Sequence, residues 1–174
     1  MKRTLVTAAF LVTVAAGWVL GQGAPFREFP IGDEQRKHDM KIAAVWLPPV
    51  TMEGMEVGDQ PDLIHLECDI HAIKGNKNGF GVGEWIPYLT VNYTLAHKES
   101  GHKLEGKMMP MVAKDGPHYG ASLQMPARGS WSVTYELRPP SENGFGRHSD
   151  PVTGVDPWWE PFTVGWEFDY QGVK

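Results

Sequence analysis

Short segments in which apolar and polar residues alternate recur along the chain, and this pattern constrains the fold more than any other feature. Successive side chains of an extended strand point to opposite faces, so such alternation indicates a strand with one buried face. In residues 131–138, "WSVTYELR", every second residue is apolar. Five further segments are candidate strands: 41–47 ("KIAAVWL"), 62–72 ("DLIHLECDIHA"), 88–95 ("YLTVNYTL"), 106–113 ("GKMMPMVA") and 161–170 ("PFTVGWEFDY").

Many half-buried strands, without an amphipathic helical pattern beyond the N-terminus, predict an all-β fold. We expect an immunoglobulin-like antiparallel β-sandwich of about seven strands with long loops. A closed barrel remains an alternative, because alternation of apolar and polar residues does not show whether a sheet closes on itself. Three stretches rich in Gly and Pro, 74–84, 114–120 and 139–161, are expected to be irregular loops that carry function.

The N-terminus has the pattern of a secretory signal peptide. Lys2 and Arg3 precede a nearly uninterrupted apolar stretch, residues 5–20, and the small residues of "GQGAP" follow it. A retained membrane anchor is the alternative, but the apolar stretch is short for a span. We therefore expect residues 1–23 to be a signal peptide and residues 24–174 to form one exported, soluble metal-binding domain.

Charge and cysteine content exclude several classes of partner and of fold. The formal charge is −5, and cleavage would remove two positive charges, leaving about −7. Such acidity argues against nucleic acid or an anionic membrane surface as the partner. No direct membrane insertion is expected after cleavage. Cys68 is the single cysteine, so an intramolecular disulfide is excluded and stability must come from burial.

The segment "IHLECDIHA", residues 64–72, carries the first candidate site. If it is a strand, His65, Glu67, Asp69 and His71 share one face and Cys68 lies on the other with the apolar residues. The polar row is either a solvated strand face or half of a metal site. Imidazole and carboxylate groups at positions i and i+2 point the same way, as ligands of one ion would.

Three residues elsewhere strengthen the metal interpretation. His118 lies in "DGPHYG" and His148 in "GFGRHSD", both bounded by glycines, and Met111 lies in "MMPMV". A methionine cluster is usually core filling, but a thioether is also a good ligand for copper. A blue-copper centre is disfavoured, because Cys68 should point away from His65. His97 and His102 are expected in a solvated turn, and His38, in a charged N-terminal segment, is given no role.

Other chemistries lack their motifs. The chain has no paired CxxC for zinc, no CxxCH, no HExxH, no GxSxG and no phosphate-binding glycine loop in a strand–loop–helix context. Trp158 and Trp159 are the tryptophans expected to be exposed, and they could form a sugar-binding platform.

The segments that carry a resemblance to a known family are "IHLECDIHA", "NKNGFGVGEWIPYLTVNYTL", "MMPMVAKDGPHYGA", "GFGRH" and "TGVDPWWEPFTVGWEFDY". The chain resembles the periplasmic iron-transport protein family, whose members are encoded beside iron permeases. The resemblance covers about residues 28 to 171. It implies an immunoglobulin-like homodimer with a copper site. Carried over by motif, the metal ligands are His65, Glu67, Met111, His118 and His148, with Asp69, His71 and Asp115 as secondary-metal or supporting residues.

The resemblance implies a periplasmic accessory protein that binds copper and iron, with manganese or zinc as substitutes, and that acts with an inner-membrane iron permease. Two alternatives from other classes remain open. One is a copper-dependent oxidoreductase acting on iron. The other is a metal-independent module that binds glycans or host proteins through Trp158 and Trp159.

Overall fold

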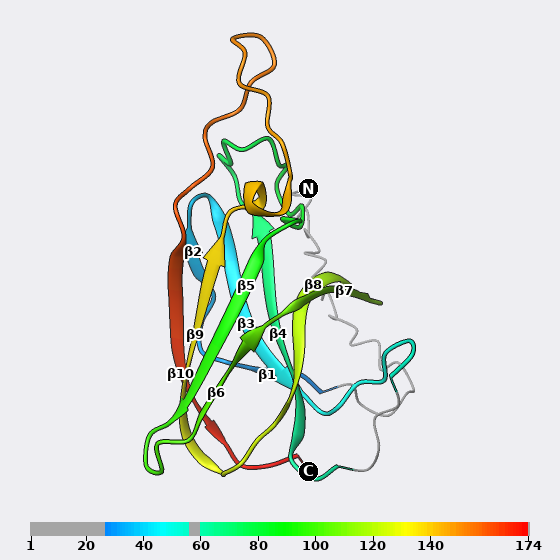
Figure 1. The fold of residues 1–174 in the computed structure, drawn as a ribbon, viewed down its shortest axis with the longest axis vertical. Helices are drawn as coiled ribbons and strands as arrows, with labels where there is room; N and C mark the ends of the chain where they lie inside the picture. Colours follow the sequence, from blue (N-terminus) through cyan, green and yellow to red (C-terminus); the bar gives the residue numbers. More distant parts are fainter. Residues whose placement is uncertain (1–26, 56–59, 174) are drawn as a thin grey trace, which may run out of the picture.

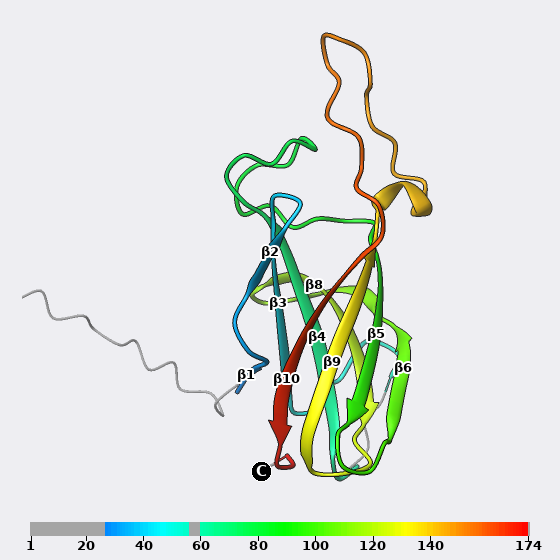
Figure 2. The same ribbon diagram turned by 90° about the vertical axis from the view of Figure 1, so that its left-hand side faces the viewer.

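Two antiparallel β-sheets face each other in the computed structural model, which describes residues 27–55 and 60–173 (Figures 1 and 2). The expected all-β sandwich is therefore confirmed. The first sheet has the order β1-β3-β4-β8-β7, with β2 paired to β3; its strands are β1 (Phe29–Pro30), β2 (Gln35–Lys37), β3 (Met40–Leu47), β4 (Leu63–Ala72), β7 (Met109–Ala113) and β8 (Gly116–Gln124). The second has the order β10-β9-β5-β6; its strands are β5 (Thr90–His97), β6 (Lys103–Lys107), β9 (Gly129–Arg138) and β10 (Phe162–Tyr170).

The predicted alternation decides which faces meet in the core. On β9, Trp131, Val133, Tyr135 and Leu137 are fully buried, as the sequence pattern predicts. On β4, Cys68 belongs to the same core and is fully buried, so it points away from the polar row as expected. Burial of these faces on both sheets supplies the main favourable free energy of folding.

One predicted loop is largely a strand. Residues 114–120 were expected to be irregular, yet β8 begins at Gly116 and pairs with β4 on one side and with β7 on the other. Prolines obscure this hairpin in the sequence, because a proline cannot donate to the ladder. Pro110 is tolerated because β7 ends the strand order and is an edge strand.

His97 was expected in a solvated turn, and this expectation is wrong. Only 7% of the residue is exposed. Its Nε2 lies 2.9 Å from the Arg128 carbonyl oxygen, and its Nδ1 accepts a 3.0 Å hydrogen bond from the Ser100 N–H. The ring packs on Trp131, with 4.9 Å between centroids. His97 therefore ties the β5–β6 hairpin to the start of β9.

The two tryptophans that were expected to form an exposed platform do not form one. Trp159 is 8% exposed and belongs to the core, while Trp158 is partly buried against it. The glycan-binding alternative thus loses the surface on which it depended.

A long excursion between β9 and β10 leaves the sandwich. After the 3₁₀ turn η1 (Pro140–Asn143), the chain extends beyond the ends of both sheets over residues 145–156 (Figure 1, orange). We call this segment the arm. The base of the arm is fixed to the loop 74–84 by the bond from the Asp156 N–H to the Lys77 carbonyl, 3.0 Å. In the described part of the chain no helix is long and apolar enough to span a membrane. The predicted signal peptide, residues 1–23, lies outside the described residues.

Candidate metal centre

Adjacent strands bring three candidate ligands to one place. His65 and Glu67 lie on β4 and face the same way. The register pairs them with Ser122 and Gly120 of β8, so His118, two residues before Gly120, emerges on the same face. The site is therefore built on the rigid interior of a sheet rather than on flexible loops.

The three side chains converge on one point. Glu67 Oε1 lies 3.2 Å from His118 Nε2 and 3.5 Å from His65 Nε2. One ligand atom from each residue can be chosen so that all lie within 4.8 Å of one another. The exposed fractions are 1% for His65, 6% for Glu67 and 4% for His118. The polar row is thus not a solvated strand face at these positions.

Both imidazoles present an unpaired atom to this point. The Nε2 atoms of His65 and His118 are buried and make no hydrogen bond within the described residues. A buried polar atom left in this state is costly unless a further group satisfies it. A divalent cation between two imidazole nitrogens and a carboxylate oxygen would satisfy all three groups, so the donor set fits a metal ion.

Burial also decides the protonation of the metal-free site. It lowers the pKa of His65 to about 4, and the neighbouring His118 acts in the same direction. It raises the pKa of Glu67 to about 8, helped by the negative charges of Asp69, Glu28 and Asp115. At neutral pH His65 is therefore a neutral donor, while the Glu67 carboxyl still holds a proton that a metal ion must displace.

Met111 of β7 lies beside these ligands. It pairs in register with His118. At Gly120, a Cβ atom would lie 2.7 Å from His65 Nε2 and 3.1 Å from Met111 Sδ. The thioether and the imidazole thus approach the same point on β8, and only a glycine leaves room for both.

A cavity of about 330 Å³ opens beside the cluster. Among the residues that line it are His65, Glu67, Met111 and His118, together with Met52 from the loop after β3. Sequence reasoning missed Met52, since no pattern connects the loop to β4, β7 and β8. Ser122, whose Oγ lies 3.4 Å from His65 Nδ1 and helps to orient the ring, was missed for the same reason.

His148 is not part of this cluster within one chain. It lies in the arm, exposed, and its Nδ1 is 2.7 Å from Thr153 Oγ1. The structure therefore brings together four of the five residues named as metal ligands, and it places the fifth in a segment that projects away from the sheets.

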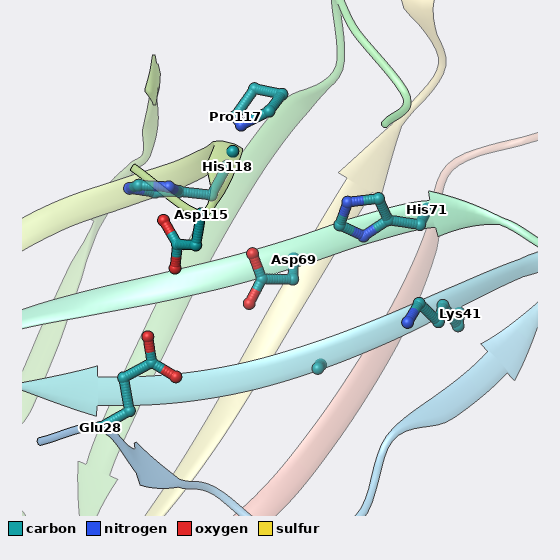
Figure 3. Close-up of a pocket in the computed structure, with 9 residues that line it drawn as sticks. Glu28, Lys41, Asp69, His71, Asp115, Pro117 and His118 are labelled. Atoms are coloured by element: carbon teal, nitrogen blue, oxygen red, sulfur yellow. The ribbon is translucent and has the colours of Figure 1, made fainter. Parts of the chain in front are cut away.

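A second, acidic pocket of about 250 Å³ adjoins the first, and His118 lines both. The carboxylates of Glu28, Asp69 and Asp115 point into it (Figure 3). Burial raises the pKa of Asp69, and the Asp115 charge raises it further, although His118 and His71 oppose the shift. Burial and the charges of Asp115 and Asp69 likewise raise the pKa of Glu28. A cation would relieve this repulsion.

Two further residues of the acidic pocket, Lys41 and His71, add a positive charge and a second imidazole. His71 and Lys41 line it from the β4 and β3 side. Burial lowers the pKa of His71, and its buried Nδ1 has no hydrogen-bond partner among the described residues. Glu28 was missed in the sequence, because nothing marks a residue before the first short strand as a neighbour of β4.

The sandwich and its His–Glu–His cluster define a β-sandwich protein with a buried metal site. The chain belongs to the Fe2+ transport protein family, whose model matches residues 25–172. The resemblance noted in the sequence is thereby confirmed.

Two solved structures are close to this chain. FetP of uropathogenic Escherichia coli strain F11 is 52% identical, with a TM-score of 0.81, over 86% of this chain and all of that one. Copper-reconstituted P19 of Campylobacter jejuni is 45% identical, with a TM-score of 0.81, over 85% of this chain and 99% of that one. A UPF0423 protein of Brucella abortus is 45% identical over 99% of this chain and 97% of its own length.

Proposed function

We propose that the protein is an exported copper-binding accessory protein for iron uptake, acting with an inner-membrane iron permease. One observation carries the proposal: two buried imidazole Nε2 atoms without hydrogen-bond partners face a single carboxylate oxygen. Membership of the Fe2+ transport family supports the link to iron.

The donor set favours copper for the buried site. Imidazole nitrogens bind copper strongly, and thioether sulfur, here Met111, is a soft ligand that selects Cu(I) among the common metals. Glu67 adds a hard, charged ligand that suits Cu(II), iron or manganese, and zinc would also accept the imidazoles. FetP and P19 have both been studied in copper-bound form. When bound, copper would supply redox chemistry that the side chains lack.

The acidic pocket is the better place for iron. Glu28, Asp69 and Asp115 offer hard oxygen ligands, which suit iron better than they suit Cu(I). Because His118 lines both pockets, an iron ion there would lie next to the copper site. We assign His71 a supporting role at the edge of this pocket.

Export rests on the sequence pattern of residues 1–23 and on the family. FetP was produced in the periplasm of its expression host. We propose the same compartment here, with residues 1–23 removed as a signal peptide and residues 24–174 forming the mature domain.

We further propose that the protein is a homodimer in which His148 of one copy completes the copper site of the other. Within a chain, the arm projects away from the sheets while the cluster of His65, Glu67 and His118 lies on β4 and β8 (Figure 1). An exposed histidine on the arm and a cavity lined by His65, Glu67 and His118 are features that two copies related by a two-fold axis can bring together.

Mixing two defective variants tests this arrangement. His118→Ala and His148→Ala should each bind copper weakly alone. After unfolding and refolding together, a mixed dimer holds one intact site, made of His65, Glu67 and His118 from one copy and His148 from the other. Tight copper binding at about a quarter of all sites is expected from random pairing. Absence of any recovery would show that the ligands do not cross between copies.

Iron uptake in cells tests the function as a whole. A strain that has the permease but lacks this protein should grow poorly on limiting iron and should be restored by the wild-type chain. His118→Ala should fail to restore growth at equal protein level. His102→Ala, which changes an exposed histidine in the β5–β6 turn, is the matched control. Restoration by His118→Ala would contradict the proposed role of the site.

A further inference from the structure

The tip of the arm contains a chain of side-chain hydrogen bonds that ends on His148. Asp150 Oδ1 accepts the backbone N–H of Val152 at 2.9 Å and of Thr153 at 3.0 Å. Asp150 Oδ2 lies 2.6 Å from Thr153 Oγ1, and the same Oγ1 lies 2.7 Å from His148 Nδ1. The hydroxyl of Thr153 therefore stands between a carboxylate and an imidazole.

The direction of these bonds follows from the number of protons. A hydroxyl carries one hydrogen, and an ionised carboxylate can only accept. Thr153 must therefore donate to Asp150, and its oxygen must accept from His148. The Nδ1 atom of His148 consequently carries the proton. In a neutral imidazole the other nitrogen, Nε2, then has a free lone pair.

The backbone holds this arrangement in place. The Gly154 N–H bonds to the Asp150 carbonyl at 2.9 Å, and the Val155 N–H bonds to the His148 carbonyl at 3.0 Å. The Arg147 guanidinium bonds to the Val155 carbonyl at 2.9 Å. The tip is thus a closed, hydrogen-bonded turn with an exposed imidazole, rather than an irregular loop.

We infer that Asp150 and Thr153 are positioning residues that hold His148 as the Nδ1–H tautomer, so that Nε2 is presented as a metal ligand. This inference rests on the proposed role of His148 at the copper site of a second copy. A ligating histidine commonly donates its other N–H to an oxygen, which fixes the ring and strengthens the ligand. Here the acceptor is a hydroxyl that is itself fixed by a carboxylate.

In the buried part of the site, a hydroxyl also lies near the Nδ1 atom of a histidine, but at a longer distance. Ser122 Oγ lies 3.4 Å from His65 Nδ1, at the limit of a hydrogen bond. His65 needs less help, because it lies in a packed, buried position with 1% of the residue exposed. An exposed ring in the arm has no such packing and depends on Thr153 and Asp150.

Nitrogen-15 NMR of the metal-free protein tests the tautomer directly. Spectra are recorded at about pH 8, where an ordinary imidazole is neutral. In wild type, His148 is expected in the Nδ1–H form. Thr153→Val should shift it toward the Nε2–H form, and Thr153→Ser, which keeps the hydroxyl, should preserve the wild-type signature. A dominant Nε2–H form in wild type, or no change in Thr153→Val, would overturn the inference.

Copper titration of the same variants provides the second readout. Thr153→Val should weaken binding by about 10-fold to 100-fold, as loss of an outer partner of a ligand does, and Thr153→Ser should restore it. Equal affinity of Thr153→Val and wild type would also overturn the inference. Unchanged affinity in His148→Ala would instead refute the ligand role of His148, while the NMR result on the metal-free tautomer would stand on its own.

Discussion

The two parts of the proposed copper site are built in opposite ways. His65, Glu67 and His118 lie on paired strands in the interior of a sheet, each at most 6% exposed. His148 lies on an arm outside the sheets, exposed, and is held by a turn. In the sheet, register and packing orient the ligands; in the arm, a short chain of hydrogen bonds must do so.

This difference gives the two parts of the proposed site different properties: the sheet holds its ligands rigidly, and the arm leaves its ligand accessible. A strand-built cluster is rigid and desolvated, which shifts the protonation of its groups. In the proposed homodimer, the arm keeps its histidine solvated until it meets the second copy. Changes in the sheet should therefore alter affinity and pH dependence, whereas changes in the arm should act through the second copy.

The largest expected effect is at the buried imidazoles. His118→Ala should reduce copper affinity by about 100-fold or more, since losing a ligand costs more than losing an outer partner. Calorimetric or competition titration measures this loss, and circular dichroism checks the fold. His102→Ala should bind copper like wild type. Wild-type affinity in His118→Ala would break the comparison, because the strand cluster would not be the binding site.

A pair of glycine substitutions should separate the two regions sharply. Gly120→Ala places a Cβ atom 2.7 Å from His65 Nε2 and 3.1 Å from Met111 Sδ, so copper affinity should fall by at least about 10-fold. In the arm, Gly146→Ala meets nothing within 4 Å in its own chain and removes no ligand, so its copper affinity should stay within about twofold of wild type. Both affinities come from the same titration. Equal, wild-type binding by the two variants would show that the space at Gly120 is not needed.

Proton release upon metal binding should distinguish Glu67 from the other ligands. At about pH 7 its carboxyl holds a proton in the metal-free protein, so copper binding should release about one more proton in wild type than in Glu67→Gln. Affinity should rise with pH until the pKa of about 8 is passed. Calorimetry in buffers of different ionisation enthalpy measures the difference. Equal proton release in both proteins would contradict the raised pKa.

The same carboxyl should govern the stability of the metal-free protein. The folded pKa of Glu67, about 8, lies above its ordinary value near 4.5. The folded state therefore binds more protons than the unfolded state between these values, and its stability falls as pH rises through them. Glu67→Gln should be more stable than wild type at about pH 8.5, by about 1–3 kcal/mol. Urea unfolding at two pH values measures this, and an unchanged difference between them would contradict it.

The smallest effect concerns the support beneath the site. The Tyr135 hydroxyl of the second sheet donates to the Glu67 carbonyl at 3.1 Å, so it ties β4 to β9 across the core. Tyr135→Phe should lower the free energy of unfolding by about 1 kcal/mol. Copper affinity should change by less than about twofold, because no ligand is lost. A large loss of affinity would show that the strand cluster depends on the opposite sheet for its geometry.

Much of this could be predicted from local patterns. Alternation located the core faces of β9 and β4 and turned Cys68 away from His65, because period-two geometry is a property of the backbone. It failed at β8, where Gly116 and Pro117 imitate a loop. The predictions that His97 lies in a solvated turn and that Trp159 is exposed were also wrong, because the burial of both residues depends on contacts with distant segments.

The residues of the candidate site likewise fall into those that the local sequence predicts and those that only the fold brings together. His65 and Glu67 share a face because they are two residues apart, and the sequence alone determines this. The tertiary structure decided that His118 and Met111 lie beside them, that Gly120 leaves the space, and that Glu28 and Met52 line the adjoining pockets. It also placed His148 on an arm away from them. Strand order and register are set by burial over the whole chain, so no local pattern contains them.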